Sequence, residues 1–291
     1  DDSITAKRAV MLGSPEDGGK IKIRSSGAHA INVEDETAAT PAEGEFLGIL
    51  IQQGEYDVES SNKAIDSMYD VVIESPEKWT DDAGEEQDSE QELKGTFKST
   101  ADNAATVTGS FFMKGGDVKI ESANGKGVNL KNGVNFNMEG GKLAIASTDD
   151  AIDIQKSSSV FTVSGGMLSI ESGNRIAKFA SGKSIVQNGG LVVGLGTKSE
   201  VVTSSGTQYS LGALLTTGIA NPGMFKVANG TKTYYVQPSG TTAMKQLYIS
   251  TPDLVDGDVA LSSLTGATLE DANKIFGSLY SAAADETGAT A

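Results

Sequence analysis

The sequence has no cysteine, and its 291 residues include only one histidine, one tryptophan and six prolines. Without cysteine there can be no disulfide, thiol nucleophile, zinc knuckle or iron–sulfur cluster. A single histidine, His29, removes most histidine-based metal sites and catalytic triads. Much of the usual enzyme repertoire is therefore excluded, and we expect no cofactor.

Basic residues are also scarce, since 23 Lys and Arg stand against 39 Asp and Glu and give a formal net charge of −16. Such a chain repels a phosphate backbone and an anionic membrane surface, so we expect no nucleic-acid partner. No apolar run approaches the length of a membrane span or of a signal sequence, so we expect neither in this chain. The numbering opens on Asp1, which fits a targeting segment that was removed or never existed.

Glycine, by contrast, is abundant and recurs in pairs on a fixed period. The pairs are spaced by 25, 25 and 24 residues, at Gly115-Gly116, Gly140-Gly141, Gly165-Gly166 and Gly189-Gly190. An alternating run follows each of the first three pairs, at residues 117–120, 142–145 and 167–170, and similar runs stand at 19–23 and 54–58. A hydrophobic period of two indicates a half-buried strand.

Two further short strands complete each repeat. The second comes seven or eight residues after the first, at Ala30-Ile31, Ala64-Ile65, Gly127-Val128 and Ala151-Ile152. The third gives two columns, Ile49, Val71, Phe111, Phe136, Phe161, Ile185 and Ile51, Ile73, Met113, Met138, Val163, Gln187. A period near 25 is too short for a propeller blade, and strands this short exclude a helical repeat. The sequence therefore predicts an all-β fold, a right-handed parallel β-helix of about seven rungs with a stacked apolar core.

The repeats also predict the organisation of the chain. We expect the β-helix over residues 18–214, with insertions at 34–46 and 75–92, and a C-terminal β cap, a short helix from Thr268 and a tail over 215–291. The second insertion holds Trp79 and eight acidic residues, Glu77, Asp81, Asp82, Glu85, Glu86, Asp88, Glu90 and Glu92. Because like charges repel and bury little apolar surface, this segment is expected to project and to be mobile except around Trp79.

Several short sequence segments resemble those of a known family. Residues 124–128 with 136–141, then 147–153, and the closing segment 248–254 resemble the bacterial secreted carbohydrate-binding family that has a polysaccharide-lyase-like β-helix. The resemblance runs from about residue 18 to residue 259, and its motifs are short segments of the repeat with low sequence complexity. It implies non-catalytic binding of a plant cell-wall or other extracellular polysaccharide by a secreted or cell-surface protein.

Three aromatic residues, Trp79, Tyr69 and Tyr56, are the candidate carbohydrate-binding residues. A flat ring offers an apolar face to the C–H side of a pyranose. The alternative is structural: Tyr56 packs at a strand edge, and Trp79 pins its loop to the coil. Tyr234, Tyr235 and Tyr248 are expected to pack in the cap.

Charged residues at one corner of the repeat allow two interpretations. Asp149, Asp150 and Asp153 could hold a metal ion, or they could belong to a ladder of stacked charges. The residues before the Ala-Ile corner are His29, Lys63, Asp102, Lys126, Asp150 and Arg175. Stacked rungs lie about 4.8 Å apart, so cations would flank Asp150 and repel a dication. We therefore expect no metal ion, and an ion pair between Lys126 and Asp150.

The functional alternatives are a lyase and a structural or adhesive surface spacer. A lyase with Arg175 as base is disfavoured because the reference pKa of arginine lies above 12 and the chain is strongly acidic. An exposed row of aromatic residues on one β face would favour polysaccharide binding. A charged and Ser/Thr-rich surface would favour the spacer.

Overall fold

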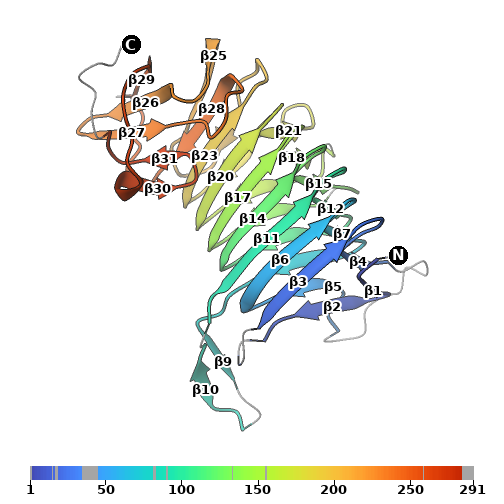
Figure 1. Ribbon diagram of the computed structural model, residues 1–291. Coiled ribbons are helices and arrows are strands. Elements are labelled where there is room, and N and C mark those ends of the chain that lie inside the picture. Colours follow the sequence, from blue (N-terminus) through green and yellow to red (C-terminus); the bar gives the residue numbers. More distant parts are fainter. Residues whose placement is uncertain are drawn as a thin grey trace.

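The computed structural model describes residues 2–14, 16, 19–34, 45–80, 83–89, 91–132, 134–154, 156–257 and 259–283. They form a coil of short parallel strands with a small β structure at its C-terminal end (Figure 1). Within these ranges, one three-residue 3-10 turn is the only helical element. No helix in the described part of the chain is long and apolar enough to cross a membrane.

Each turn of the coil contributes one strand to each of three sheets, here called A, B and C. Sheet A contains β1 (Ile4–Ala6), β4 (Ile31–Val33), β7 (Ile65–Ser67), β12 (Ala105–Val107), β15 (Val128–Leu130), β18 (Ile152–Ile154) and β21 (Ala177–Phe179). Sheet B contains β2 (Ala9–Leu12), β5 (Gly48–Ile51), β8 (Asp70–Ile73), β13 (Phe111–Met113), β16 (Phe136–Met138), β19 (Phe161–Val163), β22 (Ile185–Gln187) and β24 (Ser204–Ser205). Sheet C contains β3 (Lys20–Ser25), β6 (Gly54–Ser60), β11 (Leu93–Ser99), β14 (Asp117–Ser122), β17 (Lys142–Ser147), β20 (Met167–Ser172) and β23 (Leu191–Gly196). The parallel β-helix and its seven turns are confirmed.

The register of sheet B confirms both predicted columns. Successive strands pair through the first column, in the order Ile49, Val71, Phe111, Phe136, Phe161, Ile185. The residues of the second column lie two positions later in each strand and pair with one another in the same way. The rings of Phe111 and Phe136 stack with centroids 5.1 Å apart, and Phe161 meets Phe136 edge-on at 4.8 Å. All three rings are fully buried, so they form the centre of the core.

The coil begins earlier than the sequence predicted. Sheets A and B start with β1 and β2, which pair in parallel with β4 and β5. The expected start at residue 18 is therefore wrong. Neither strand follows a glycine pair or an alternating run of the length seen later, so the periodicity does not mark them.

Glycine pairs occupy the corner between sheets B and C because no side chain fits there. The second glycine of each pair has a positive φ, for example +70° at Gly141. A Cβ added to Gly141 would lie 2.6 Å from the carbonyl carbon of Gly115, one turn away. The pairs therefore let the backbones of successive turns approach closely.

A small β structure closes the C-terminal end. β28 (Met244–Ser250) runs antiparallel to β23, and β25 (Leu211–Ile219) pairs with β28. A five-stranded antiparallel sheet follows, in the order β29 (Val259–Leu264), β26 (Met224–Asn229), β27 (Lys232–Val236), β31 (Leu279–Tyr280), β30 (Lys274–Phe276). Its apolar side packs on Val193 and Leu195 of β23, which point away from the coil core. This cap therefore covers the outer face of the last turn.

The expected helix from Thr268 is wrong. Only Asp271–Asn273 form a 3-10 turn, and its N-cap, Glu270, makes no side-chain capping bond. None of the three residues of the turn is buried. A capping motif without an apolar face to pack is not enough to hold a helix.

The described residues of the second insertion form a hairpin that projects from the coil (Figure 1), and Asp81, Asp82 and Glu90 lie outside the described residues. β9 (Lys78–Thr80) pairs antiparallel with β10 (Glu86–Asp88). Its base is held by the buried Gln53 side chain, whose Nε2 donates to the carbonyl oxygen of Pro76 at 2.6 Å. Most of the first insertion, residues 35–44, lies outside the described residues, as do residues 284–291 of the tail.

Candidate functional site

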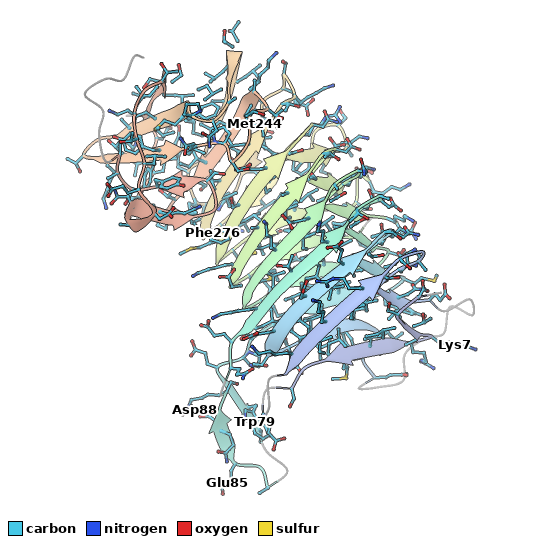
Figure 2. All side chains as sticks on the ribbon, viewed as in Figure 1. Lys7, Trp79, Glu85, Asp88, Met244 and Phe276 are labelled. Carbon is cyan, nitrogen blue, oxygen red and sulfur yellow. The ribbon has the colours of Figure 1, made fainter. Side chains whose placement is uncertain are left out.

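The structure places the three predicted aromatic residues apart from one another. Tyr56 points into the coil from sheet C, Tyr69 stands between the sheet A strand β7 and the sheet B strand β8, and Trp79 lies in β9, opposite Gln87. Figure 2 shows Trp79 on the projecting hairpin. They do not form a row on one face.

Tyr56 has no ring face left for a sugar. Its side chain is 4% exposed, and its ring stacks on Phe97 with centroids 6.2 Å apart. The hydroxyl lies 2.8 Å from the carbonyl oxygen of Gln52, and burial raises the pKa of Tyr56 to about 12. Tyr69 and Trp79 are both half-buried, and Tyr69 packs against the same core. Both stay candidate sugar platforms, and Trp79 is the one that lies away from the coil.

The predicted charge ladder at the corner before sheet A needs one change. Its column is Asp2, His29, Lys63, Asn103, Lys126, Asp150 and Arg175, because Ala105 pairs with Val128 and with Ile65. Asn103 therefore takes the place predicted for Asp102, while the placement of Arg175 is confirmed. An amide at this position interrupts the alternation of charges.

The ion pairs of this corner also differ from the prediction. Lys126 pairs with Asp153, which is in the outward column of sheet A, and not with Asp150. Asp150 instead pairs with Arg175 at 3.3 Å and with Lys178 at 4.0 Å. The prediction failed because a side chain on one turn also reaches the outward column of the next strand.

Asp150 and Asp153 are almost fully buried; Arg175 and Lys178 lie beside Asp150, and Lys126 lies beside Asp153. Burial and the neighbouring charge of Asp149 raise the pKa of Asp150, and Arg175 only partly offsets them. Burial alone would lower the pKa of Arg175, but its bond to Glu200 and the charge of Asp150 hold that pKa above the ordinary value. In the described ranges, no three acidic or histidine side chains are arranged to hold a metal ion.

The outer face of sheet C carries a charge pattern that sequence reasoning missed. Its first column is Lys20, Glu55, Lys94, Asp117, Lys142, Met167 and Leu191, and its third is Arg24, Glu59, Lys98, Glu121, Ala146, Glu171 and Leu195. The middle column is Lys22, Asp57, Thr96, Lys119, Ala144, Ser169 and Val193. Signs alternate over the first five residues of the first column and the first four of the third, and beyond them only Glu171 is charged before the face becomes apolar under the cap.

Ion pairs link successive strands of this face. Lys20 lies 2.7 Å from Glu55, Lys98 lies 3.4 Å from Glu59, and Arg24 contacts Asp57. The face holds seven Lys or Arg and six Asp or Glu, so it is close to neutral on a chain of net charge −16. Negative charge is therefore concentrated elsewhere on the molecule.

Open grooves adjoin this face, and three of them exceed 600 Å³. One of about 620 Å³ lies over β3, β6, β11 and β14 and is lined by charged side chains such as Lys22, Asp57 and Lys119. Another of about 710 Å³ runs along the glycine corner beside Lys142, under the base of the hairpin. The last, about 660 Å³, lies between Ala146 and the cap loop at Ser239.

The second and third grooves border opposite ends of β17. Between the two grooves, the outward residues of β17 are Ala144 and Ala146. Their side chains are shorter than those of Lys119 and Glu121 on the neighbouring strand β14, so the surface is lower there. The cap forms the wall on the other side, where Ser239 and Ser278 donate hydrogen bonds to Glu171. We call this strip of small side chains on β17, between the two grooves and in front of the cap, the trough.

The alternating charges had a signal in the sequence. The runs Lys-Ile-Lys-Ile-Arg at 20–24 and Glu-Tyr-Asp-Val-Glu at 55–59 carry opposite signs at equivalent positions. Comparing the outward residues of successive strands would have found them. The trough could not be found in this way, because its wall is the cap, which lies outside the repeat.

Comparisons with known proteins gave no match to a family model, to a curated protein or to a solved structure.

Proposed function

We propose that this protein binds an extracellular polysaccharide without cleaving it, through the outer face of sheet C in front of the cap. The observation that carries the proposal is the trough along β17, with grooves at both ends and polar walls. Two open grooves at opposite ends of one strand accommodate a long polymer, whereas small substrates are usually enclosed in a concave pocket.

The chemistry of the trough supports a hydroxyl-rich ligand. The groove beside the cap is lined by hydroxyl groups, including Ser147, Thr148 and Thr242, and by the charged Lys98 and Glu121. Charged side chains make strong hydrogen bonds with neutral hydroxyls. The wall-polysaccharide ligand and the location outside the cell follow from the family resemblance and remain part of the proposal.

The state of Arg175 supports binding without turnover. A base for β-elimination must give up its proton near neutral pH, and the two carboxylates that pair with Arg175 raise its pKa. Arg175 also pairs with groups of the sheet A corner and lines none of the three grooves. We therefore expect no release of unsaturated product from polygalacturonate.

The spacer is the second candidate function, and one observation favours it. On the outward positions of the described strands of sheet C there is no aromatic residue, and sheet B contributes one, Phe112. A spacer needs only a rigid coil, so it would retain no polysaccharide.

Retention on insoluble polysaccharides separates these candidates. We expect wild-type protein to be retained and Ala146→Trp, which fills the trough, to lose most retention. Thr162→Trp is the matched control, because Thr162 is an outward residue of sheet B, and it should bind like wild type. Equal retention of both variants would contradict the trough as the binding site. No retention of wild type on any polysaccharide would contradict the proposal and leave the spacer.

A further inference from the structure

The two ends of the coil differ. At the C-terminal end, β28 and β25 continue sheet C in antiparallel orientation, and the cap covers the last turn. At the N-terminal end, β1, β2 and β3 are the outermost strands of their sheets. One edge of β3 pairs with β6, and its other edge pairs with no strand in the described part of the chain.

Each of the three outward columns of sheet C begins with a cation on β3, the strand with the free edge. Inside sheet C, Lys94 lies between Glu55 and Asp117, and Lys98 lies between Glu59 and Glu121. The outward residues of β3, in contrast, are Lys20, Lys22 and Arg24, and acidic residues flank them only on the β6 side. A further strand continuing the pattern would carry three acidic residues at alternate positions.

The inward residues of β3 indicate which kind of residue should alternate with the acidic residues of an added strand. Ile21 is half-buried and Ile23 is 7% exposed, whereas Val58 and Phe97 in the column of Ile23 are fully buried. An added strand would cover both isoleucines if its intervening residues were apolar. The edge therefore fits a strand of the pattern acidic–apolar–acidic–apolar–acidic.

We propose that the free edge of β3 binds an extended segment of a partner protein with this alternating acidic and apolar pattern, as an additional parallel strand of sheet C. Main-chain hydrogen bonds to an exposed edge supply the affinity in this mode of recognition, and side chains supply the specificity. The three cations select an acidic strand and fix its register.

A second copy of this chain does not fit this edge. Two copies joined edge to edge through β3 would bring Lys20, Lys22 and Arg24 of each copy together. The opposite edge of sheet C is β25, whose sequence Leu-Gly-Ala-Leu-Leu-Thr-Thr-Gly-Ile has no acidic residue. Cations on an edge strand also discourage self-association.

A peptide with the sequence of β6, Gly-Glu-Tyr-Asp-Val-Glu-Ser, has the required pattern and serves as the probe. In fluorescence anisotropy with the full chain, the labelled peptide should bind, and a scrambled peptide of the same composition should bind at least about tenfold more weakly. Of two N-methylated forms, modified at odd or at even residues, one should lose binding, because alternate amides face the neighbouring strand.

Two charge variants separate edge binding from attraction to the whole face. Lys22→Glu should weaken binding of the acidic peptide and favour a form in which lysine replaces only the middle acidic residue, because Lys20 and Arg24 still pair with the other two. Lys142→Glu changes the same face away from the edge and should leave binding unchanged. Circular dichroism would show that both variants are folded.

Four results would overturn the proposal. If the scrambled peptide binds as well, or if both N-methylated forms bind unchanged, the attraction is to the charged face and not to the edge. If no peptide binds at about millimolar concentration, the cations only protect the edge. Dimerisation of the free chain in analytical ultracentrifugation that is lost in Lys22→Glu would assign the edge to a second copy.

Discussion

At the scale of single residues, buried polar groups fix the corners of the coil. Ser60, Ser99, Ser122, Ser147 and Ser172 stack in one column at the end of the sheet C strands and are inward or half-buried. Each hydroxyl donates to a carbonyl oxygen of a corner, as Ser122 does to Asp102 at 2.7 Å. The column satisfies backbone acceptors that the turn leaves without a strand partner.

Replacing one of these serines should destabilise the coil. Ser122→Ala removes a buried donor and should lower the free energy of unfolding by about 1 kcal/mol. Urea denaturation measures the change. Thr96→Ala, at an outward position of the same sheet, is the control and should change it by less than about 0.5 kcal/mol. Equal effects of the two substitutions would contradict the role given to the column.

Asp150 should make stability depend on pH. Its pKa is raised in the fold, so its stabilising contribution is present below the ordinary value of 3.8 and is lost as pH rises through the raised pKa. Asp150→Asn has no carboxyl group to ionise, so this variant does not lose that stability as the pH rises. The stability of this variant relative to wild type should therefore increase as pH rises from about 4 to 7 in urea titrations.

At Asp57 the dependence of stability on pH has the opposite sign, so this residue serves as the comparison. The hydrogen bond from Arg24 lowers the pKa of Asp57, so its contribution is present above 3.8 and is lost as pH falls through the lowered pKa. Asp57→Asn should therefore lose stability relative to wild type as pH rises through that window. The same slope for both variants would contradict the assigned environments.

At the scale of elements, the stacked phenylalanines of sheet B carry much of the core. Phe136 is fully buried between Phe111 and Phe161. Phe136→Ala should cost about 3–5 kcal/mol in the free energy of unfolding, because it leaves a cavity in the middle of the stack. Asn137→Ala, on the outward side of the same strand, should cost far less. A loss below about 1 kcal/mol for Phe136→Ala would show that the stack is not central.

The hairpin should behave as a separate element. Trp79 and its partner strand project from the coil and share no sheet with it. Trp79→Ala should therefore leave the melting temperature almost unchanged, which differential scanning calorimetry would show. If this variant binds polysaccharide more weakly at unchanged stability, the hairpin contributes a sugar platform beside the trough. A large loss of stability would instead show that Trp79 holds the coil.

The repeating elements could be predicted with their register, whereas for the part that does not repeat only the β character of the cap was predicted correctly and its helix was not. The sheet B columns followed from a period of two and a fixed spacing. Asp102 was placed one residue away from Asn103 because that turn differs in length from its neighbours. The cap and the 3-10 turn at Asp271 have no repeat to align, and their form depends on packing against β23.

At the scale of the whole molecule, charge and shape divide the surface into distinct parts. The outer face of sheet C is nearly neutral and leads to the trough, whereas the hairpin and the chain as a whole are acidic. The rigid stacking of seven turns holds the face flat, and the cap ends it with a wall. This arrangement is suited to binding a polymer across the coil.

Hydroxyl-radical footprinting of the protein on an insoluble polysaccharide that retains it would show where the polymer lies. If the polymer lies in the trough, side chains on β14, on β17 and on the cap loop at residues 239–244 are protected, and sheets A and B are not. Protection confined to the hairpin around Trp79, or spread evenly over all three sheets, would contradict binding in the trough.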